Sequence, residues 1–260
     1  MKKPSLSKLL YVLAAHVSTY SLTVLASQDA GSASGIHVDA GLVSAYMAHG
    51  MEVVDGACFQ SGVAVDAVLP GLKFKFWNSA AIDRDQRTYD EYDFMMLYGH
   101  RLGSGLNTID LHGYADYFVL PHANRPEGNL TGWKFNAGAR LPNLIVVGKV
   151  TAGLGYDLYH WTPDRPGRFE ASSVHEITAS VACDLPSALA ERGLRQVVLY
   201  GQSDYHTIKS EIGNADLGLS MPIAWKSMTL TPAVWHQWSF TDSVAPQDRT
   251  WVSINLSRSF

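Results

Sequence analysis

Charged side chains recur at every second position in several segments of this 260-residue chain. Lys73 and Lys75 form one such pair, and Glu91 and Asp93 form another. Alternate residues of a strand share one face, so each segment would present its charges to a single polar space. Charged groups in such a space either line a wet channel or pair into a plug. The candidates are Lys73, Lys75, Glu91, Asp93, Asp110, His112, Asp116, Lys134, Arg140, Lys149, Asp157 and Glu176.

Serine and histidine residues offer a second type of chemistry, hydrolysis of lipids at a barrel wall. Ser203 lies near His206 in sequence, and His175 follows Ser172 and Ser173. A nucleophile needs a base within hydrogen-bonding reach, but neither group has the His-x-Ser-Asn spacing of barrel phospholipases or deacylases. The ten histidines also lack the spacing of metal ligands. The sequence therefore favours a protein that is not an enzyme and has no metal or other cofactor.

The elements that would position the charges are short segments of alternating apolar and polar residues. In residues 72–80, Leu72, Phe74 and Phe76 alternate with Lys73 and Lys75. A barrel strand crosses a bilayer in about 9–11 residues, with one face toward lipid and the other toward the lumen. Twelve such strands are expected, at residues 36–48, 59–68, 72–80, 89–100, 106–118, 130–140, 145–159, 174–184, 194–206, 215–223, 227–240 and 250–260.

The connections between these segments alternate in length. Short turns are expected at residues 69–71, 103–105, 141–143 and 224–226, with a longer one at 185–193. Longer polar loops separate them, at residues 49–58, 82–88, 119–129, 161–172, 207–214 and 241–249. Short periplasmic turns and long outer loops are typical of outer-membrane barrels. We therefore expect an all-β fold: a transmembrane, antiparallel, up-and-down β-barrel of about 12 strands with both termini periplasmic.

The N-terminus reads as an export signal. Lys2 and Lys3 precede an apolar stretch, and Val24, Leu25 and Ala26 offer a small-residue cleavage site. An N-terminal helix of the mature protein is the alternative. We assign residues 1–26 to a signal peptide, 27–35 to a flexible leader and 36–260 to an outer-membrane β-barrel. These assignments place the protein in the outer membrane of a Gram-negative bacterium after Sec export.

The C-terminal segment carries an alternating pattern that ends in an aromatic residue. This pattern resembles the signal read by the barrel-assembly machinery of the outer membrane, and its residues are Phe260, Leu256, Ile254 and Val252. Arg258 interrupts the apolar phase, but a long basic side chain can extend to the membrane interface. The expected partners are this machinery, outer-membrane lipid and lipopolysaccharide, and small solutes. The net charge of −4 gives no reason to expect nucleic acid.

Short motifs in the first half of the chain resemble those of the TorF-type porin family. The family pattern Ser-x-Tyr-x-x-Arg-Gly is matched except at His49, which stands where the family has Arg. The matching residues are Ser44, Tyr46, Gly50, Gln60, Trp77, Glu91, Asp93, Gly113, Tyr114, Tyr117 and Pro121. The resemblance implies a small outer-membrane barrel for passive transport, without catalytic residues.

The interior charges decide between two kinds of barrel. Acids outnumber bases at the inward positions, because Asp39, Asp66, Asp204 and Asp216 share the inward phase. A twelve-strand barrel is wider than the filled eight-strand barrels and narrower than large porins. We expect a narrow passive channel for small hydrophilic solutes with a weak preference for cations. The alternatives are a structural or binding barrel with a plugged lumen and, less favoured, an outer-membrane lipid hydrolase.

Overall fold

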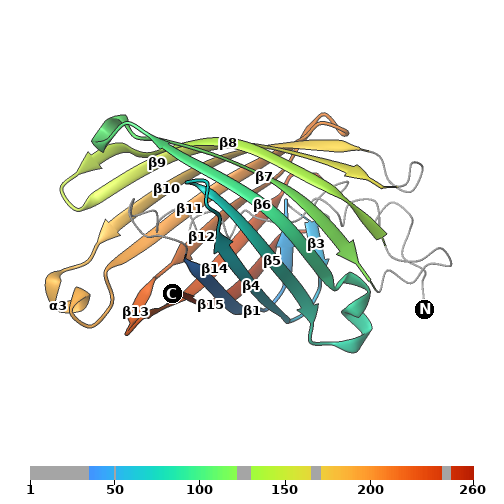
Figure 1. The fold of residues 1–260 in the computed structure, drawn as a ribbon, viewed down its shortest axis with the longest axis horizontal. Helices are drawn as coiled ribbons and strands as arrows, with labels where there is room; N and C mark the ends of the chain where they lie inside the picture. The colour runs from blue at the N-terminus through green and yellow to red at the C-terminus, as the bar shows by residue number, and fades with distance from the viewer. Residues whose placement is uncertain (1–34, 50, 122–129, 165–170, 242–246) are drawn as a thin grey trace.

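The computed structural model describes residues 35–49, 51–121, 130–164, 171–241 and 247–260. The predicted signal peptide and residues 27–34 of the predicted leader lie outside these ranges. Within them, twelve antiparallel strands form one closed barrel (Figure 1). The strands are β1 (Ile36–Val43), β4 (Cys58–Asp66), β5 (Leu72–Ala81), β6 (Glu91–Leu102), β7 (Ile109–Leu120), β8 (Leu130–Val147), β9 (Val150–Pro163), β10 (Ser172–Asp184), β11 (Gln196–His206), β12 (Glu211–Ser220), β14 (Met228–Ser239) and β15 (Arg249–Ser259).

The barrel closes between its first and last strands. β1 pairs antiparallel with β15 from His37 opposite Ser259 to Val43 opposite Ser253. Every barrel strand therefore has two neighbours and no backbone edge is left open, which is the arrangement a bilayer requires. The predicted antiparallel barrel is confirmed. We call the end where β1 begins and β15 ends the near end, and the opposite end the far end.

The outer wall is a belt of exposed apolar side chains. On β5, Phe74 and Phe76 are exposed, whereas Lys73 and Lys75 between them are buried. Val252 and Ile254 continue the belt on β15, and Phe260 follows it with the Arg258 guanidinium 4.2 Å from the centre of its ring. An exposed apolar surface of this extent indicates contact with lipid. Recognition of the Phe260 segment by the assembly machinery stays a prediction.

A charge in the middle of this belt should destabilise the barrel. Ile177 lies near the centre of β10, and its side chain is 58% exposed. Ile177→Arg should lower the free energy of unfolding in liposomes by about 2–4 kcal/mol, because the guanidinium would face acyl chains. Ile177→Leu keeps the apolar contact and serves as the matched control. Urea titration followed by tryptophan fluorescence measures both, and equal midpoints would contradict a lipid-facing Ile177.

Three predicted strand boundaries in the second half are wrong. The expected turn at residues 141–143 does not form: β8 continues to Val147, and Gly148 and Lys149 make the turn to β9. The pairing of β8 with β9 shifts register between Leu141 and Ile145. Pro142 lies in this irregular stretch, where its lack of a backbone N–H does not interrupt the regular ladder. β12 begins at Glu211, and the expected loop at 207–214 is a turn at 207–210.

The predicted first strand, residues 36–48, is also too long. The barrel strand ends at Val43, and the chain then forms a separate two-stranded sheet of β2 (Tyr46–Ala48) and β3 (Met51–Val54). The Ser44 N–H donates to the Val252 carbonyl at 2.9 Å, and the Ser44 hydroxyl accepts from the Val252 N–H at 3.0 Å. These bonds fix the point where the chain leaves the barrel wall.

Short elements fill the remaining described connections. They are η2 (Arg84–Tyr89), η3 (Gly105–Asn107), α3 (Ser187–Ala190) and β13 (Ile223–Trp225). In the described part of the chain, no helix has the length and apolar character to cross a membrane. Cys58 is buried, Cys183 is exposed, and neither forms a disulfide.

Candidate functional site

The interior of the barrel is crossed by the segment between β1 and β4. We call residues 44–57 the inward hairpin. Tyr46 and Val54 pack against Trp77 on one wall, and the ring centroids of Tyr46 and Trp77 are 6.2 Å apart. Met47 packs on the other side, against a cluster that contains Trp235. Apolar contacts on both sides hold the hairpin inside the lumen, where it narrows the passage. The sequence pattern predicted an outer loop at 49–58, and this prediction is wrong.

The far end of β15 adds a polar tether to the same hairpin. The Arg249 guanidinium lies 2.7 Å from a Glu52 carboxylate oxygen and also pairs with Asp55. The Gln247 amide donates to the Glu52 carboxylate at 3.3 Å. Glu52 and Asp55 belong to the hairpin, whereas Arg249 begins β15 and Gln247 precedes it, so the tether joins the hairpin to the last barrel strand.

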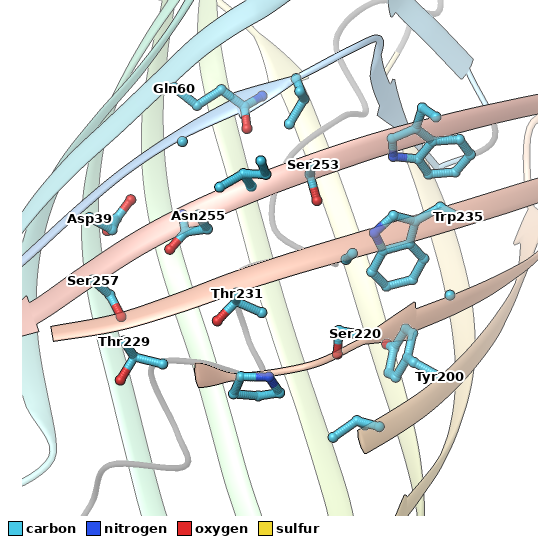
Figure 2. Close-up of a pocket in the computed structure, with 18 of the residues that line it drawn as sticks. Asp39, Gln60, Tyr200, Ser220, Thr229, Thr231, Trp235, Ser253, Asn255 and Ser257 are labelled. Carbon is cyan, nitrogen blue, oxygen red and sulfur yellow. The ribbon is translucent and has the colours of Figure 1, made fainter. Parts of the chain in front are cut away.

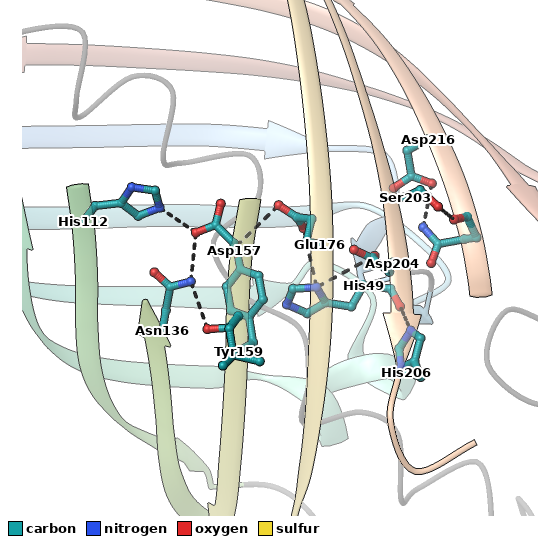
Figure 3. A network of polar contacts seen from close by, with 12 residues as sticks. His49, His112, Asn136, Asp157, Tyr159, Glu176, Ser203, Asp204, His206 and Asp216 are labelled. Atoms are coloured by element: carbon teal, nitrogen blue, oxygen red, sulfur yellow. Dashed lines mark hydrogen bonds and ion pairs between the residues drawn. The ribbon is translucent and has the colours of Figure 1, made fainter. Parts of the chain in front are cut away.

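His49 forms the buried turn of the hairpin (Figure 3). Its Nδ1 atom lies 3.7 Å from Glu176 on β10 and 3.8 Å from Asp204 on β11. Its carbonyl oxygen accepts a hydrogen bond from His206 at 3.1 Å. His49 does not belong to a barrel strand, and burial away from water lowers the pKa of its imidazole from 6.5 to about 4. The imidazole is therefore neutral at neutral pH.

One half of the lumen is filled by paired charges. Lys134 on β8 lies 3.2 Å from Glu91, 3.0 Å from Asp93 and 2.9 Å from Asp116. All four side chains are buried, and the three carboxylates come from β6 and β7. A buried cluster of this kind is stable only while each member keeps its partners. It occupies part of this side of the lumen.

A second charged cluster surrounds Asp157 on β9. The Asp157 carboxylate accepts from Asn136 at 2.9 Å, and His112 and Arg140 lie 2.5 Å and 3.4 Å from it. Gly138 leaves the room for this arrangement, since a Cβ there would overlap both the Asp157 carboxylate and the His112 ring. The small residue on β8 thus permits the cross-strand network drawn in Figure 3.

Three further ion pairs lie toward the near end. Lys75 lies 3.0 Å from Asp39, Lys73 lies 3.2 Å from Asp66, and Arg101 pairs with Asp110 at 2.6 Å. Each links neighbouring or next-neighbouring strands of the barrel wall. These three basic side chains are therefore neutralised by specific carboxylates.

The other half of the lumen holds a cavity of about 680 Å³. Its wall is made mainly by β11, β12, β14, β15 and β1, and most of its polar side chains carry hydroxyl or amide groups (Figure 2). The examples labelled in Figure 2 are Gln60, Ser220, Thr229, Thr231, Ser253, Asn255 and Ser257. The cavity runs from Ser259 at the near end to the inward hairpin. A wall made mostly of hydroxyl and amide groups suits water and hydrophilic solutes, and Asp39, Asp216, Arg195 and Arg258 add charges to it.

Aromatic rings border the cavity beside the inward hairpin. Trp235 and Trp251 stack with centroids 6.1 Å apart and an interplanar angle of 10°. Tyr200 meets Trp235 edge-on at 5.7 Å. Met47 of the hairpin packs against these rings, and all of them line the cavity.

The structure separates the predicted interior residues into two groups. Eleven of the twelve candidates point into the barrel, in the charged clusters and pairs described above, and none of the eleven lines the 680 Å³ cavity. Lys149 lies instead on the exposed turn between β8 and β9. Whether the eleven border an open pore stays a prediction. The cavity-lining residues were not among the candidates, although Ser253, Asn255 and Ser257 alternate visibly with Val252, Ile254 and Leu256.

Four of the family-like motif residues lie in or beside the inward hairpin. Ser44 follows β1, and Tyr46, Gln60 and Trp77 all line the cavity. Glu91 and Asp93 belong to the Lys134 cluster. The others are elsewhere: Gly113 and Tyr114 lie on β7 facing β8, Tyr117 packs on the outward Trp133, Pro121 follows β7, and Gly50 lies outside the described residues.

The serine–histidine pairs considered for hydrolysis are not assembled. Ser203 and His206 lie on opposite faces of β11, because they are three positions apart in a strand whose side chains alternate. His175 contacts the Tyr156 hydroxyl at 2.6 Å instead of a serine. Ser173 does lie 2.8 Å from His160 on the outer wall, but no described carboxylate orients that histidine. Neither of the two groups predicted from the sequence therefore forms a nucleophile–base–acid arrangement in the described structure.

Comparison with known proteins gives the fold class. No family model and no curated protein matches the sequence. The structure resembles that of a KdgM porin with a TM-score of 0.51 and 9% identity, over 86% of this chain and 99% of that chain. It also matches a NanC porin with a TM-score of 0.46 and 9% identity, over 86% of this chain and 98% of that chain. A third match is the COG4313 outer membrane channel from Pseudomonas putida F1, with a TM-score of 0.48 and 10% identity over 100% of both chains. The likeness to the KdgM porin shows the fold, that of an outer-membrane β-barrel.

Proposed function

We propose that the protein is a narrow passive channel for small hydrophilic solutes in the outer membrane. The observation that carries this proposal is the 680 Å³ cavity along β12, β14, β15 and β1, with its wall of hydroxyl and amide groups. Such groups exchange hydrogen bonds with water and with polar solutes at little cost. The ion-paired half and the inward hairpin fill the rest of the lumen, so the passage is narrow. Liposome swelling with sugars of increasing size tests the proposal, and no uptake of any sugar would contradict it.

A weak preference for cations follows from the charges beside this route. Asp39 is paired with Lys75, whereas Asp216 accepts a hydrogen bond from the Asn214 amide at 3.1 Å and lines the cavity. Arg195 and Arg258 also line the cavity, so the preference rests on the lumen as a whole, where acids outnumber bases among the described residues. This excess of acids would favour cations over anions.

Removing the Asp216 charge should reduce this preference. Asp216→Asn keeps the shape of the side chain, and the ratio of cation to anion permeability should fall by about two- to threefold, as expected for one screened charge. Reversal potentials under a salt gradient measure the ratio. Asp184→Asn makes the same change on an exposed side chain and should leave the ratio unaltered. A wild type that prefers anions, or equal ratios in the two variants, would overturn the assignment.

A plugged barrel is the second candidate. It is favoured by the inward hairpin and by the Lys134 cluster, which together occupy much of the lumen. It predicts a wild type without conductance in planar bilayers. Steady conductance by the wild type would exclude it in favour of the channel.

Export and assembly complete the proposal. The signal-like residues 1–26 would direct Sec export, and the Phe260 segment would be read by the assembly machinery, so that both chain ends face the periplasm. The resemblance of Tyr46, Trp77 and their partners to TorF-type porin motifs supports a place in that family. The exposed far-end loops would meet lipopolysaccharide. N-terminal sequencing of protein from outer-membrane fractions tests the cleavage after Ala26.

A further inference from the structure

The contacts at the turn of the inward hairpin are not explained by solute passage. His49, Glu176 and Asp204 come from three separate elements, and all three are at most 2% exposed. One possible ligand atom from each lies within 4.8 Å of the others. Glu176 and Asp204 are directly opposite each other in the pairing of β10 with β11. The barrel wall thus brings two carboxylates together, and the hairpin delivers an imidazole to them (Figure 3).

The His49 ring supplies an independent observation. The His49 side chain is only 1% exposed, yet neither of its ring nitrogens, Nδ1 or Nε2, has a hydrogen-bond partner. Buried polar atoms are almost always satisfied, so an unpartnered ring aimed at two carboxylates needs an explanation. The Nδ1 atom lies 3.7 Å and 3.8 Å from the carboxylate oxygens, which is too long for hydrogen bonds. Two ligands of one tetrahedral zinc ion, each about 2.0–2.2 Å from it, would be about 3.3–3.6 Å apart.

We propose that His49, Glu176 and Asp204 bind one divalent transition-metal ion of the zinc type. Two carboxylates balance the charge of the ion, and the imidazole favours a first-row metal over the oxygen-seeking Ca²⁺ and Mg²⁺. Three protein ligands leave a fourth position for water. His49 also lines the 680 Å³ cavity, which gives the ion a route to the site.

Neighbouring groups are placed to orient the ligands. The Tyr159 hydroxyl donates to Glu176 at 3.5 Å, and the edge of the His49 ring meets Tyr159 at 4.4 Å between centroids. The His206 bond to the His49 carbonyl holds the backbone of the turn. Partners of this kind fix the orientation of metal ligands. A bound ion would fasten the hairpin to β10 and β11 and so hold the constriction in place.

Metal binding can be measured directly on the full-length mature barrel, prepared without an affinity tag, refolded in detergent and treated with EDTA. After addition of Zn²⁺ and gel filtration, we expect about one ion per chain by elemental analysis and a higher thermal midpoint. Co²⁺ should give the visible absorption of a site with nitrogen and oxygen ligands. A wild type that retains no Zn²⁺ and gives no Co²⁺ spectrum would overturn the proposal. These readouts do not depend on whether the barrel conducts.

Two variants assign the ligands. Asp204→Asn and His49→Gln should each weaken Zn²⁺ binding by more than 10–100-fold, which is the typical loss when a residue that only orients a metal ligand is replaced. His175→Gln removes a histidine from the outer wall and should bind like the wild type. Heat-dependent gel mobility shows whether each variant forms a barrel. Wild-type affinity in the folded Asp204 and His49 variants, or equal loss in the His175 variant, would reject this site.

Discussion

Removal of the inward hairpin is expected to raise single-channel conductance several-fold. Val43 and Cys58 are paired neighbours on β1 and β4, so a two-residue Asn-Gly turn can join them in place of residues 44–57. The barrel ladder stays intact, while the segment that crosses the lumen is lost. Conductance should rise because a twelve-strand barrel without an internal segment is wider than one whose lumen is filled. Planar-bilayer recordings at fixed salt measure the change.

A matched shortening elsewhere controls for general loosening of the barrel. Residues 186–194 form the α3 connection at the near end, where Leu185 and Arg195 are joined by a backbone hydrogen bond of 2.8 Å. Replacing this connection with a two-residue turn should leave conductance close to that of the wild type. If both shortened proteins conduct like the wild type, the hairpin does not form the constriction. A silent wild type with a conducting hairpin deletion would identify the hairpin as a plug.

Replacement of Lys134 is expected to have the largest effect on stability. Its ammonium group is the shared partner of Glu91, Asp93 and Asp116, and none of these side chains is more than 8% exposed. Lys134→Met keeps much of the volume but leaves the carboxylates without this cation. Breaking a buried pair in this way costs about 3–5 kcal/mol. Urea unfolding of the barrel in liposomes, followed by tryptophan fluorescence, gives the loss.

Lys149→Met is the matched control for this experiment. The same substitution on the exposed β8–β9 turn should change the free energy of unfolding by no more than about 0.5 kcal/mol. Adding Asp116→Asn to Lys134→Met should recover part of the loss, since one uncompensated carboxylate is removed. Equal stability of Lys134→Met and Lys149→Met would show that the cluster does not hold β6, β7 and β8 together.

The sequence predicted the barrel wall well because wall formation depends on a local period. Phe74 and Phe76 alternate with Lys73 and Lys75, and any strand with that alternation must divide its side chains between two environments. The wrong turn at residues 141–143 shows where a local signal fails. Pro142 is typical of turns, but pairing with β9 over the following residues outweighs it, and the strand continues to Val147.

The inside of the barrel was decided by tertiary structure. The residues that meet at the hairpin turn, His49, Glu176 and Asp204, are far apart in the chain, and no spacing in the sequence joins them. Alternation indicates that a side chain faces the lumen, but it does not indicate which of twelve strands lies opposite. Only ring closure by β1 and β15 sets those distances. The sequence thus determined the alternation of inward and outward side chains along most strands, and closure of the barrel decided that charges pair on one side while hydroxyls border a cavity on the other.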